Sequence, residues 1–548
     1  MGADLTRRGL IRSAAAGAGA LAGGSLLAPR TVFAGESGEA VFRVNVPGSG
    51  RVIATKRPFD LIGIDGVPGS GAQVRARGED GRWSDWVEVT AAHGHGPDDG
   101  APSTLSDPVW TGPADAFEVR SKRPLHGARA VLVHSGGTAH AAAAKHYVAS
   151  NLPAGPGQPA IIARSSWASA ACKPRVPAVF GAVQLAFVHH TVSSNAYSAS
   201  QSAAMVRSIC LFHKYGNGWN DIGYNFVVDR YGQIFEARAG GIDEAIVGAQ
   251  AGGYNVYSTG VALLGTFSGG GPNRQTFNAL SHLLAWKLSV HGIELPGTVT
   301  VQVTSQGAPY SRYRAGSRVR LNRIAGHRDG DTTSCPGTGM YRQLPRLRQV
   351  VRGLAGTVGA LSLQGQAAQP GSVTVGGSLS AGGVALGGAT IEVQRRSTTK
   401  GDATLATATT NADGSWSVAL PLASNASLRA VFRGDTGHPA VVSTGIYAAV
   451  PPQLTLTAAT QMTTPGGVID FSGSVAPAKK QVSIVISQQQ PDGSLTTIRA
   501  IRLNAASDGT FARSIGFANA GQYQVIAHTA ADDTNALGSS APVAITVA

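Results

Sequence analysis

Two linker-like segments divide the chain, which predicts several domains, each with its own core. One lies around 150–160 and contains NLPAGPGQPA, and the other is a Gly/Gln/Ala-rich segment around 355–370. Gly and Pro interrupt helices and strands, so these segments are expected to be linkers. The 548 residues also exceed what one hydrophobic core holds, which predicts about three or four domains.

The first 34 residues have the character of an export signal. An Ala/Gly/Leu-rich stretch at 13–28 follows MGADLTRRGLIR, and TVFA ends on the small residue Ala34, which suits cleavage. The pair Arg7-Arg8 resembles the twin-arginine signal that sends folded proteins across a membrane. We expect residues 1–34 to be removed and the mature chain to be secreted or held at the cell wall. No later stretch reads as a transmembrane segment.

The chain is strongly basic, and its positive charge is spread along the sequence. Lys and Arg number 45 against 31 Asp and Glu, a net charge of +14 with a pI of about 10.0. No zinc-finger spacing, reading helix or basic stripe with aromatics is present, so we expect no nucleic-acid partner. Outside a membrane, such a field suits the anionic polymers of a bacterial wall, with simple solubility as the alternative.

Between the signal and the first linker, residues 35–150 have the pattern of antiparallel strands. Alternating runs such as VFRVNV and AFEVRS are separated by Gly/Pro/Asp clusters. We expect a β-sandwich-like domain here. Trp83 and Trp86 could stack on sugar rings, although packing within the domain is the favoured interpretation.

Beyond the second linker the sequence repeats itself. TNADGSWSVAL at 410–420 is echoed by AASDGTFARSI at 505–515, each with an Asp-Gly pair that predicts a hairpin. We expect two β-sandwiches, at 368–450 and 451–548, that resemble bacterial immunoglobulin-like domains. They offer reach or wall attachment and carry no evident chemistry.

The central segment carries residues suited to binding a metal. FVHHT at 187–191 ends an apolar, strand-like run with His189 and His190, and IAGHRDGDTTSCPG places His327 and Cys335 in one loop. Two imidazoles and one thiolate suit zinc and leave the fourth tetrahedral position open. From these residues alone, either His189 or His190 could be the third ligand, and Cys335 could be an inert buried thiol.

Several ordered blocks of this segment resemble one family. They are ARSSW at 163–167, FVHHT at 187–191, GWNDIGYNFVVD at 218–229, GYNVYSTGVALLG at 253–265 and AGHRD…SCPG at 325–337. The chain resembles peptidoglycan recognition proteins and the related N-acetylmuramoyl-L-alanine amidases over about residues 160–350. Apolar periodicity in the same segment predicts strands and helices that form an α/β domain at 160–355, with a mixed sheet flanked by helices.

The resemblance implies a role for specific residues. His189, His327 and Cys335 match the zinc ligands of the family, Tyr224 matches a catalytic tyrosine, and Thr333 falls where active members carry lysine or threonine. With Cys335 assigned to the metal, Cys172 and Cys210 remain and are expected to form a disulfide. The general base is not identified, and Asp329, Asp331 or water alone are open alternatives.

The resemblance also points to substrate contacts. His190 is expected to line the groove beside the metal, with a structural hydrogen bond as the alternative. Gln250 stands where family members commonly carry histidine, so we expect it to contact substrate. Gly218 and Trp219 accompany a preference for diaminopimelate-type stem peptides in recognition proteins, although Trp219 could equally be core packing.

Taken with the export signal, the resemblance implies a secreted, Zn²⁺-dependent N-acetylmuramoyl-L-alanine amidase. Its partner would be bacterial peptidoglycan, and its reaction the hydrolysis of the amide between the lactyl group of muramic acid and L-alanine. Two alternatives stay open: a non-catalytic module that binds peptidoglycan, and a surface adhesin whose sandwiches do the work. Nothing in the sequence indicates an oligomeric state.

Overall fold

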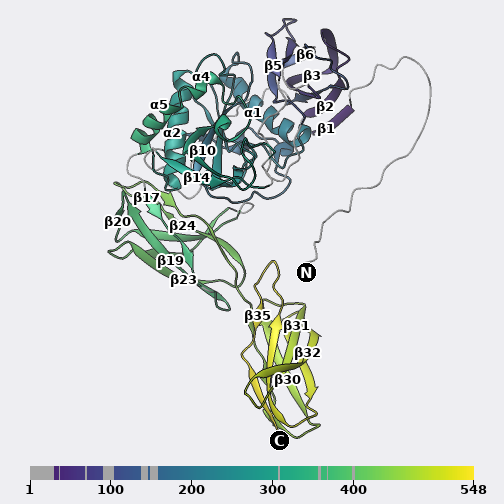
Figure 1. Ribbon diagram of the computed structural model, residues 1–548, viewed down its shortest axis with the longest axis vertical. Helices are drawn as coiled ribbons and strands as arrows, with labels where there is room; N and C mark the ends of the chain where they lie inside the picture. The colour runs from purple at the N-terminus through teal and green to yellow at the C-terminus, as the bar shows by residue number, and fades with distance from the viewer. Residues whose placement is uncertain are drawn as a thin grey trace, which may run out of the picture.

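The computed structural model shows four folded parts that follow one another along the chain (Figure 1). It describes residues 30–35, 38–67, 71–89, 104–136, 146–147, 158–295, 297–305, 309–355, 359–366, 368–397 and 401–548. The expected signal segment 1–34 therefore lies outside the described residues, except for its last part, which forms strand β1. In the described part of the chain, no helix has the length and hydropathy to cross a membrane.

A seven-stranded sheet forms the centre of the domain that carries the candidate site. Its order is β16 (Ile324–Gly326), β10 (Leu185–His190), β13 (Ser258–Leu263), β11 (Phe226–Val228), β12 (Ile234–Glu236), β9 (Ile161–Ile162) and β8 (His146–Tyr147). β10 runs parallel to β13 and β16, whereas β11 and β12 form an antiparallel hairpin around Gly232, whose φ is +82°. The predicted mixed sheet is therefore found.

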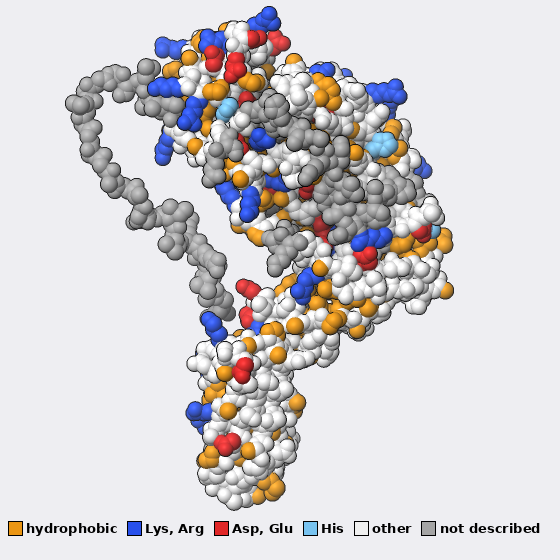
Figure 2. Space-filling view, turned by 180° about the vertical axis from the view of Figure 1, so that it is seen from behind, with side chains coloured by type: hydrophobic (Ala, Val, Ile, Leu, Met, Phe, Trp, Pro, Cys, Tyr) orange, Lys and Arg blue, Asp and Glu red, His pale blue; other side chains and the backbone are white. Residues whose placement is uncertain are grey.

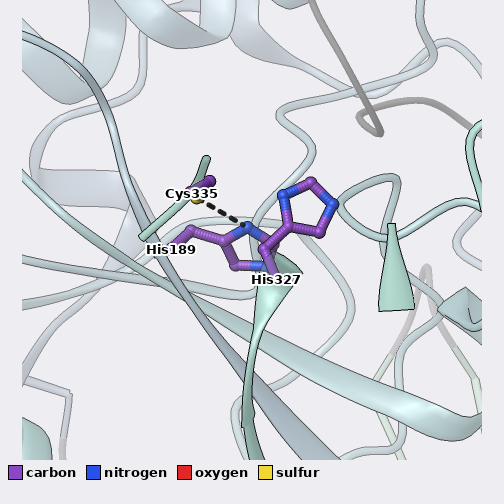
Figure 3. A group of neighbouring side chains, drawn as sticks. All are labelled: His189, His327 and Cys335. Atoms are coloured by element: carbon purple, nitrogen blue, oxygen red, sulfur yellow. Dashed lines mark hydrogen bonds between the residues drawn. The ribbon is translucent and has the colours of Figure 1, made fainter. Parts of the chain in front are cut away.

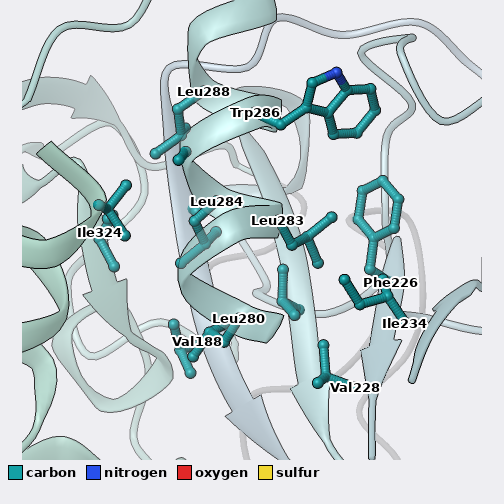
Figure 4. Packing of buried hydrophobic residues seen from close by; sticks show 14 of the residues in the cluster. Val188, Phe226, Val228, Ile234, Leu280, Leu283, Leu284, Trp286, Leu288 and Ile324 are labelled. Atoms are coloured by element: carbon teal, nitrogen blue, oxygen red, sulfur yellow. The ribbon is translucent and has the colours of Figure 1, made fainter. Parts of the chain in front are cut away.

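One face of this sheet is covered by the helices α2 (Arg274–Val290) and α5 (Leu344–Ala355). Successive strand residues point to opposite faces, so Val188 of β10 meets the Leu280 and Leu284 side of α2 (Figure 4). α2 starts where the Asn273 side chain accepts a hydrogen bond from the Thr276 amide at 2.9 Å. Burial of each such leucine contributes about 1.5–3 kcal/mol.

The opposite face is covered by α1 (Ser202–Leu211), which continues as a π-helical turn, η4 (Phe212–Gly216). Met205, Ile209 and Phe212 form an apolar stripe along this segment, which ends at Gly216. The predicted disulfide is also present: Cys172, in the 3-10 turn η2 (Ala170–Cys172), is bonded to Cys210 of α1. It ties the start of the domain to this helix.

The remaining elements of this region are two paired strands, two short helices and three 3-10 turns. They are β14 (Thr298–Gln302), β15 (Arg318–Asn322), α3 (His327–Gly330), α4 (Thr338–Tyr341), η1 (Arg164–Ser166), η3 (Ala199–Gln201) and η5 (Asn255–Tyr257). β14 and β15 pair with each other and not with the central sheet.

The N-terminal domain is antiparallel, as its alternating pattern predicts, and its strands belong to one sheet, so the β-sandwich-like arrangement stays a prediction. Its order is β1 (Arg30–Ala34), β2 (Ala40–Asn45), β7 (Arg129–His134), β3 (Arg51–Asp65), β6 (Val109–Ser121), β4 (Ala72–Gly78) and β5 (Val87–Val89). The guanidinium of Arg75 lies 4.6 Å from the ring centres of both Trp83 and Trp86. This stacking supports the packing interpretation of the two tryptophans, and contact with sugar stays a prediction.

This N-terminal domain shares its core with the central domain. Leu61, Leu105 and Val131 belong to the same buried cluster as Phe212 and Tyr224. A Cβ atom at Gly63 would overlap the Phe212 ring, so the close approach of β3 to η4 requires glycine there. The segment at 150–160 therefore links two domains that share a hydrophobic core, and it does not mark a boundary between independent cores.

The two C-terminal domains each pack two sheets around one core. The first has β17 (Gly359–Leu361), β18 (Gln364–Gly365), β19 (Ser372–Ala381), β20 (Val384–Ala385) and β23 (Ser415–Pro421) facing β21 (Thr390–Arg395), β22 (Ala403–Thr409), β24 (Ala426–Phe432), β25 (Val441–Val442) and β26 (Ile446–Ala448). The second has β27 (Gln453–Leu454), β28 (Thr457–Ala458), β30 (Val468–Ala476) and β33 (Thr510–Gly516) facing β29 (Met462–Thr463), β31 (Gln481–Gln489), β32 (Leu495–Asn504), β34 (Gly521–Thr529), β35 (Gly538–Ser539) and β36 (Val543–Val547). The two-sheet arrangement is as expected, and the likeness to immunoglobulin domains stays a prediction.

Two details of this region differ from the sequence prediction. The first sandwich begins at Gly359 and not at 368, because β17 and β18 pair with β19. The Asp-Gly turns have the expected positive φ, at Gly414 and Gly509, but they do not close hairpins. Each joins strands of opposite sheets, β22 to β23 and β32 to β33, so the turn crosses the sandwich.

A buried ionic cluster joins the first sandwich to the central domain. Arg429 of β24 places Nη1 3.1 Å from Asp243 and 2.9 Å from Glu244, and its Nε lies 3.0 Å from Asp402. Its side chain is 4% exposed. Arg396 pairs with Glu244 from the same side and covers the Phe180 ring. The sandwich is therefore docked and does not hang from a free linker.

We predict that Arg429→Ala destabilises the chain strongly. It leaves three buried carboxylates without their shared cation, which costs about 3–5 kcal/mol in such pairs. The free energy of unfolding in urea measures this, with Arg77→Ala as the control, because Arg77 forms a more exposed pair with Asp115. Equal stability of the two variants would contradict the docking role of the cluster.

Candidate metal centre

Two parallel strands bring the candidate histidines together. Val188 of β10 pairs with Gly326 of β16, so His189 and His327 each follow a paired position at the same edge of the sheet. Their ring centres lie 4.5 Å apart. His189 shares the sheet face of α1, because it alternates with Val188.

Cys335 lies beside the two histidines at the end of a loop that is closed by hydrogen bonds of its own backbone. The Arg328 amide donates to the Cys335 carbonyl at 2.9 Å, and the Cys335 amide donates to the hydroxyl of Thr333 at 3.1 Å. The Sγ atom of Cys335 then lies 3.7 Å from Nδ1 of His189 (Figure 3). The loop thus turns the thiol toward the two imidazoles.

The three side chains form a cluster able to hold a metal ion. One donor atom from each of His189, His327 and Cys335 lies within 4.8 Å of the others. Zinc binds nitrogen at about 2.0–2.1 Å and sulfur at about 2.3 Å in a tetrahedron, which separates its donors by about 3.5 Å. Burial raises the pKa of the Cys335 thiol, so a thiolate there needs a cation beside it. The donor set and its spacing therefore fit zinc.

The far side of each imidazole is held by a polar partner. Nε2 of His327 lies 2.8 Å from Oδ2 of Asp331, and Nε2 of His189 lies 2.5 Å from Oε1 of Gln250. Both acceptors are oxygens, so the protons sit on Nε2 and the Nδ1 lone pairs remain for a metal. Gln250 is fully buried. The side chain of Gln250 is engaged behind a ligand candidate, and its expected contact with substrate stays a prediction.

Tyr224 and Thr333 lie beside this cluster with hydroxyl groups. The Tyr224 ring centre is 5.4 Å from that of His189. Burial, followed by the charges of Asp107 and Cys335, raises the pKa of Tyr224 well above its usual value, so the phenol keeps its proton. The Thr333 oxygen accepts from the Cys335 amide, which leaves its O–H able to donate. Both groups can donate to a developing negative charge.

The other expected substrate residues are more buried than a groove lining requires. The Phe267 amide donates to Nδ1 of His190 at 3.3 Å, which is the structural bond left open by the sequence. Trp219 is 7% exposed and lies 4.5 Å from the His213 ring, which supports core packing. Gly218 has a φ of +80°, a turn position that favours glycine. Substrate contact by these three stays a prediction.

Sequence reasoning missed one charged group and left two others open. Burial is the main cause of the raised pKa of Tyr224 and of Cys335, and the carboxylate of Asp107, in the N-terminal domain, raises both further. No sequence spacing links Asp107 to them, because it lies in another domain. Asp329 accepts from the Gly326 amide and the Tyr341 hydroxyl, and Asp331 bonds His327, so both candidate bases already have structural partners.

Two family matches cover most of the N-terminal half of the chain. Residues 180–338 match the family described as N-acetylmuramoyl-L-alanine amidase. Residues 31–151 match the one described as Rv3811 N-terminal galactose-binding domain-like. The first match contains every residue of the metal cluster.

Individual relatives match the same central region. A peptidoglycan-recognition protein of Drosophila simulans is 29% identical over 186 residues, which are 34% of this chain and 86% of that protein. The N-acetylmuramoyl-L-alanine amidase of Mus musculus is 30% identical over 190 residues, 34% of this chain and 31% of that protein. Among solved structures, Drosophila PGRP-LB is 26% identical, with 34% of this chain and 91% of that chain covered and a TM-score of 0.26. Residues 180–338 of this chain form a domain of the N-acetylmuramoyl-L-alanine amidase family.

Proposed function

We propose that the chain is an exported, zinc-dependent N-acetylmuramoyl-L-alanine amidase. The observation that carries the proposal is the buried cluster of His189, His327 and Cys335 with Tyr224 beside it. The complete donor set, together with a protonated phenol, favours catalysis over recognition alone. The family match and the relatives named as amidases support the same reaction.

The proposed reaction adds water across the amide between the lactyl group of muramic acid and L-alanine. The water oxygen bonds to the carbonyl carbon, the C–N bond breaks, and a proton moves to the amine of L-alanine. Zinc, when bound, polarises the carbonyl and lowers the pKa of water. Tyr224 and Thr333 donate hydrogen bonds to the carbonyl oxygen as it gains charge. Asp331 orients the His327 imidazole that would hold the ion.

We further propose that peptidoglycan is reached outside the cell, within an anionic wall. The twin-arginine-like start of the chain and its net charge of +14 support this. Lys and Arg side chains are scattered over the face seen in Figure 2 and do not gather into one patch. Scattered cations favour loose adsorption to wall phosphates and carboxylates over one tight site. A diaminopimelate-type stem peptide is the proposed substrate form, through Gly218 and Trp219.

Incubation of purified peptidoglycan with the mature protein tests the proposed function directly. We expect mass spectrometry to find free stem peptides that begin with L-alanine, lost on zinc chelation and restored by added zinc. Zinc-loaded protein that binds peptidoglycan without releasing peptides would identify a recognition module and contradict the amidase proposal.

The Tyr224→Phe variant tests the role of the phenol. Because one oxyanion donor is lost, we expect turnover to fall about 100- to 1000-fold, while zinc binding is unchanged. Tyr523→Phe is the matched control, since Tyr523 is also buried and donates one hydrogen bond, to Asn519, in the last domain. Equal turnover of both variants would remove Tyr224 from the mechanism.

A further inference from the structure

The side chain of Gln250 lies between a metal-ligand candidate and a buried serine. Its Oε1 is 2.5 Å from Nε2 of His189, and its Nε2 donates to the hydroxyl of Ser258 at 2.8 Å. We propose that Gln250 is a positioning residue of the metal site, which fixes the tautomer and orientation of the His189 ring. This inference rests on the proposed function, because it concerns the same zinc site.

The backbone carbonyl of Tyr254 determines which groups donate and which accept in these hydrogen bonds. The Ser258 hydroxyl donates to the Tyr254 carbonyl at 2.9 Å, which cannot donate in return. The Ser258 oxygen therefore accepts from the amide nitrogen of Gln250, and the amide oxygen of Gln250 faces His189. An oxygen there requires the proton on Nε2 of His189, so the lone pair of Nδ1 faces Cys335. In each of these hydrogen bonds, the choice of donor and acceptor fixes which group donates in the next one.

Packing holds Gln250 in this arrangement. Its backbone amide and that of Ala251 donate to Oδ1 of Asn255 at 2.8 and 3.1 Å. A Cβ at Gly260 would overlap the side chain of Gln250, so the strand residue beside it has to be glycine. The amide is thus ordered before any metal binds, which removes the entropy cost of ordering it later.

The two histidines differ in the charge of their partners. His327 has the carboxylate of Asp331, whereas His189 has the neutral amide of Gln250. A neutral partner orients the ring without adding a second buried negative charge beside the Cys335 thiolate. Such a charge would need further compensation in a low-dielectric interior.

Zinc affinity of the full-length protein tests the role of Gln250 without relying on activity. In competition with a chromophoric chelator, we expect Gln250→Met to bind zinc about 10- to 100-fold more weakly. Methionine keeps the unbranched shape and loses the acceptor. Gln250→Glu keeps an acceptor facing His189 but adds a buried negative charge and loses the donor to Ser258, so we expect it to bind zinc more weakly than the wild type and more tightly than Gln250→Met. The absorption spectrum of the cobalt-loaded protein should change in Gln250→Met.

Ser258→Ala keeps Gln250 and removes only the hydrogen bond that orients the side-chain amide of Gln250. We expect the zinc affinity of Ser258→Ala to lie between the affinities of the wild type and Gln250→Met. Ser281→Ala is the matched control, because Ser281 is also buried and donates to one carbonyl, that of Phe277 in α2. Thermal unfolding of the metal-free variants shows that each is folded.

The inference is overturned if Gln250→Met and Ser258→Ala bind zinc as tightly as Ser281→Ala and the wild type, with an unchanged cobalt spectrum. Failure of the proposed function gives a different result. A wild-type chain that binds zinc and releases no peptide contradicts the amidase proposal, and the affinity series still decides the role of Gln250.

Discussion

Parallel pairing of β10 with β13 and β16 is the constraint on which the site depends. Because the three strands run in one direction, their carboxyl ends meet at one edge, where backbone groups no longer need sheet partners. His189 is the last residue but one of β10, and His327 starts α3, directly after β16. The helices α2 and α5 bury one face and α1 the other, so this edge is held rigidly by two cores.

Burial of the cluster has to be matched by polar partners, and the structure supplies one for each ligand. His189 faces Gln250, His327 faces Asp331, and Cys335 accepts from the His190 amide at 3.4 Å. In a low-dielectric interior, a polar group without a hydrogen-bond partner lowers the stability of the fold. The positions around the cluster therefore require side chains that can form these hydrogen bonds. The same burial that raises the pKa of the Cys335 thiol makes a cation favourable there.

Local patterns in the sequence predicted what depends on neighbours in sequence. Apolar periodicity and turn residues account for strand β10, helix α2 and the hairpin at Gly232, whereas the Cys172–Cys210 disulfide is implied by the resemblance, which assigns Cys335 to the metal. The contact of Gln250 with His189 could not be predicted in this way, because the two residues are 61 positions apart and only the folded sheet brings them together. The Asp-Gly turns show the same limit: Gly414 sets a local φ, whereas the sheet each strand joins is decided by packing across the sandwich.

The cores that cross the domain boundaries bear on how such chains can be recombined. Phe33 stacks on Tyr215 at 3.9 Å on one side, and on the other Val431 and Val442 belong to the core that includes α2. A chimera joined at the Pro/Gly-rich segments would preserve the covalent linkers and still lose these apolar contacts. Exchange between related chains therefore has to carry the matching surfaces together, so the first three parts are constrained to diverge as one unit although they look like separable domains.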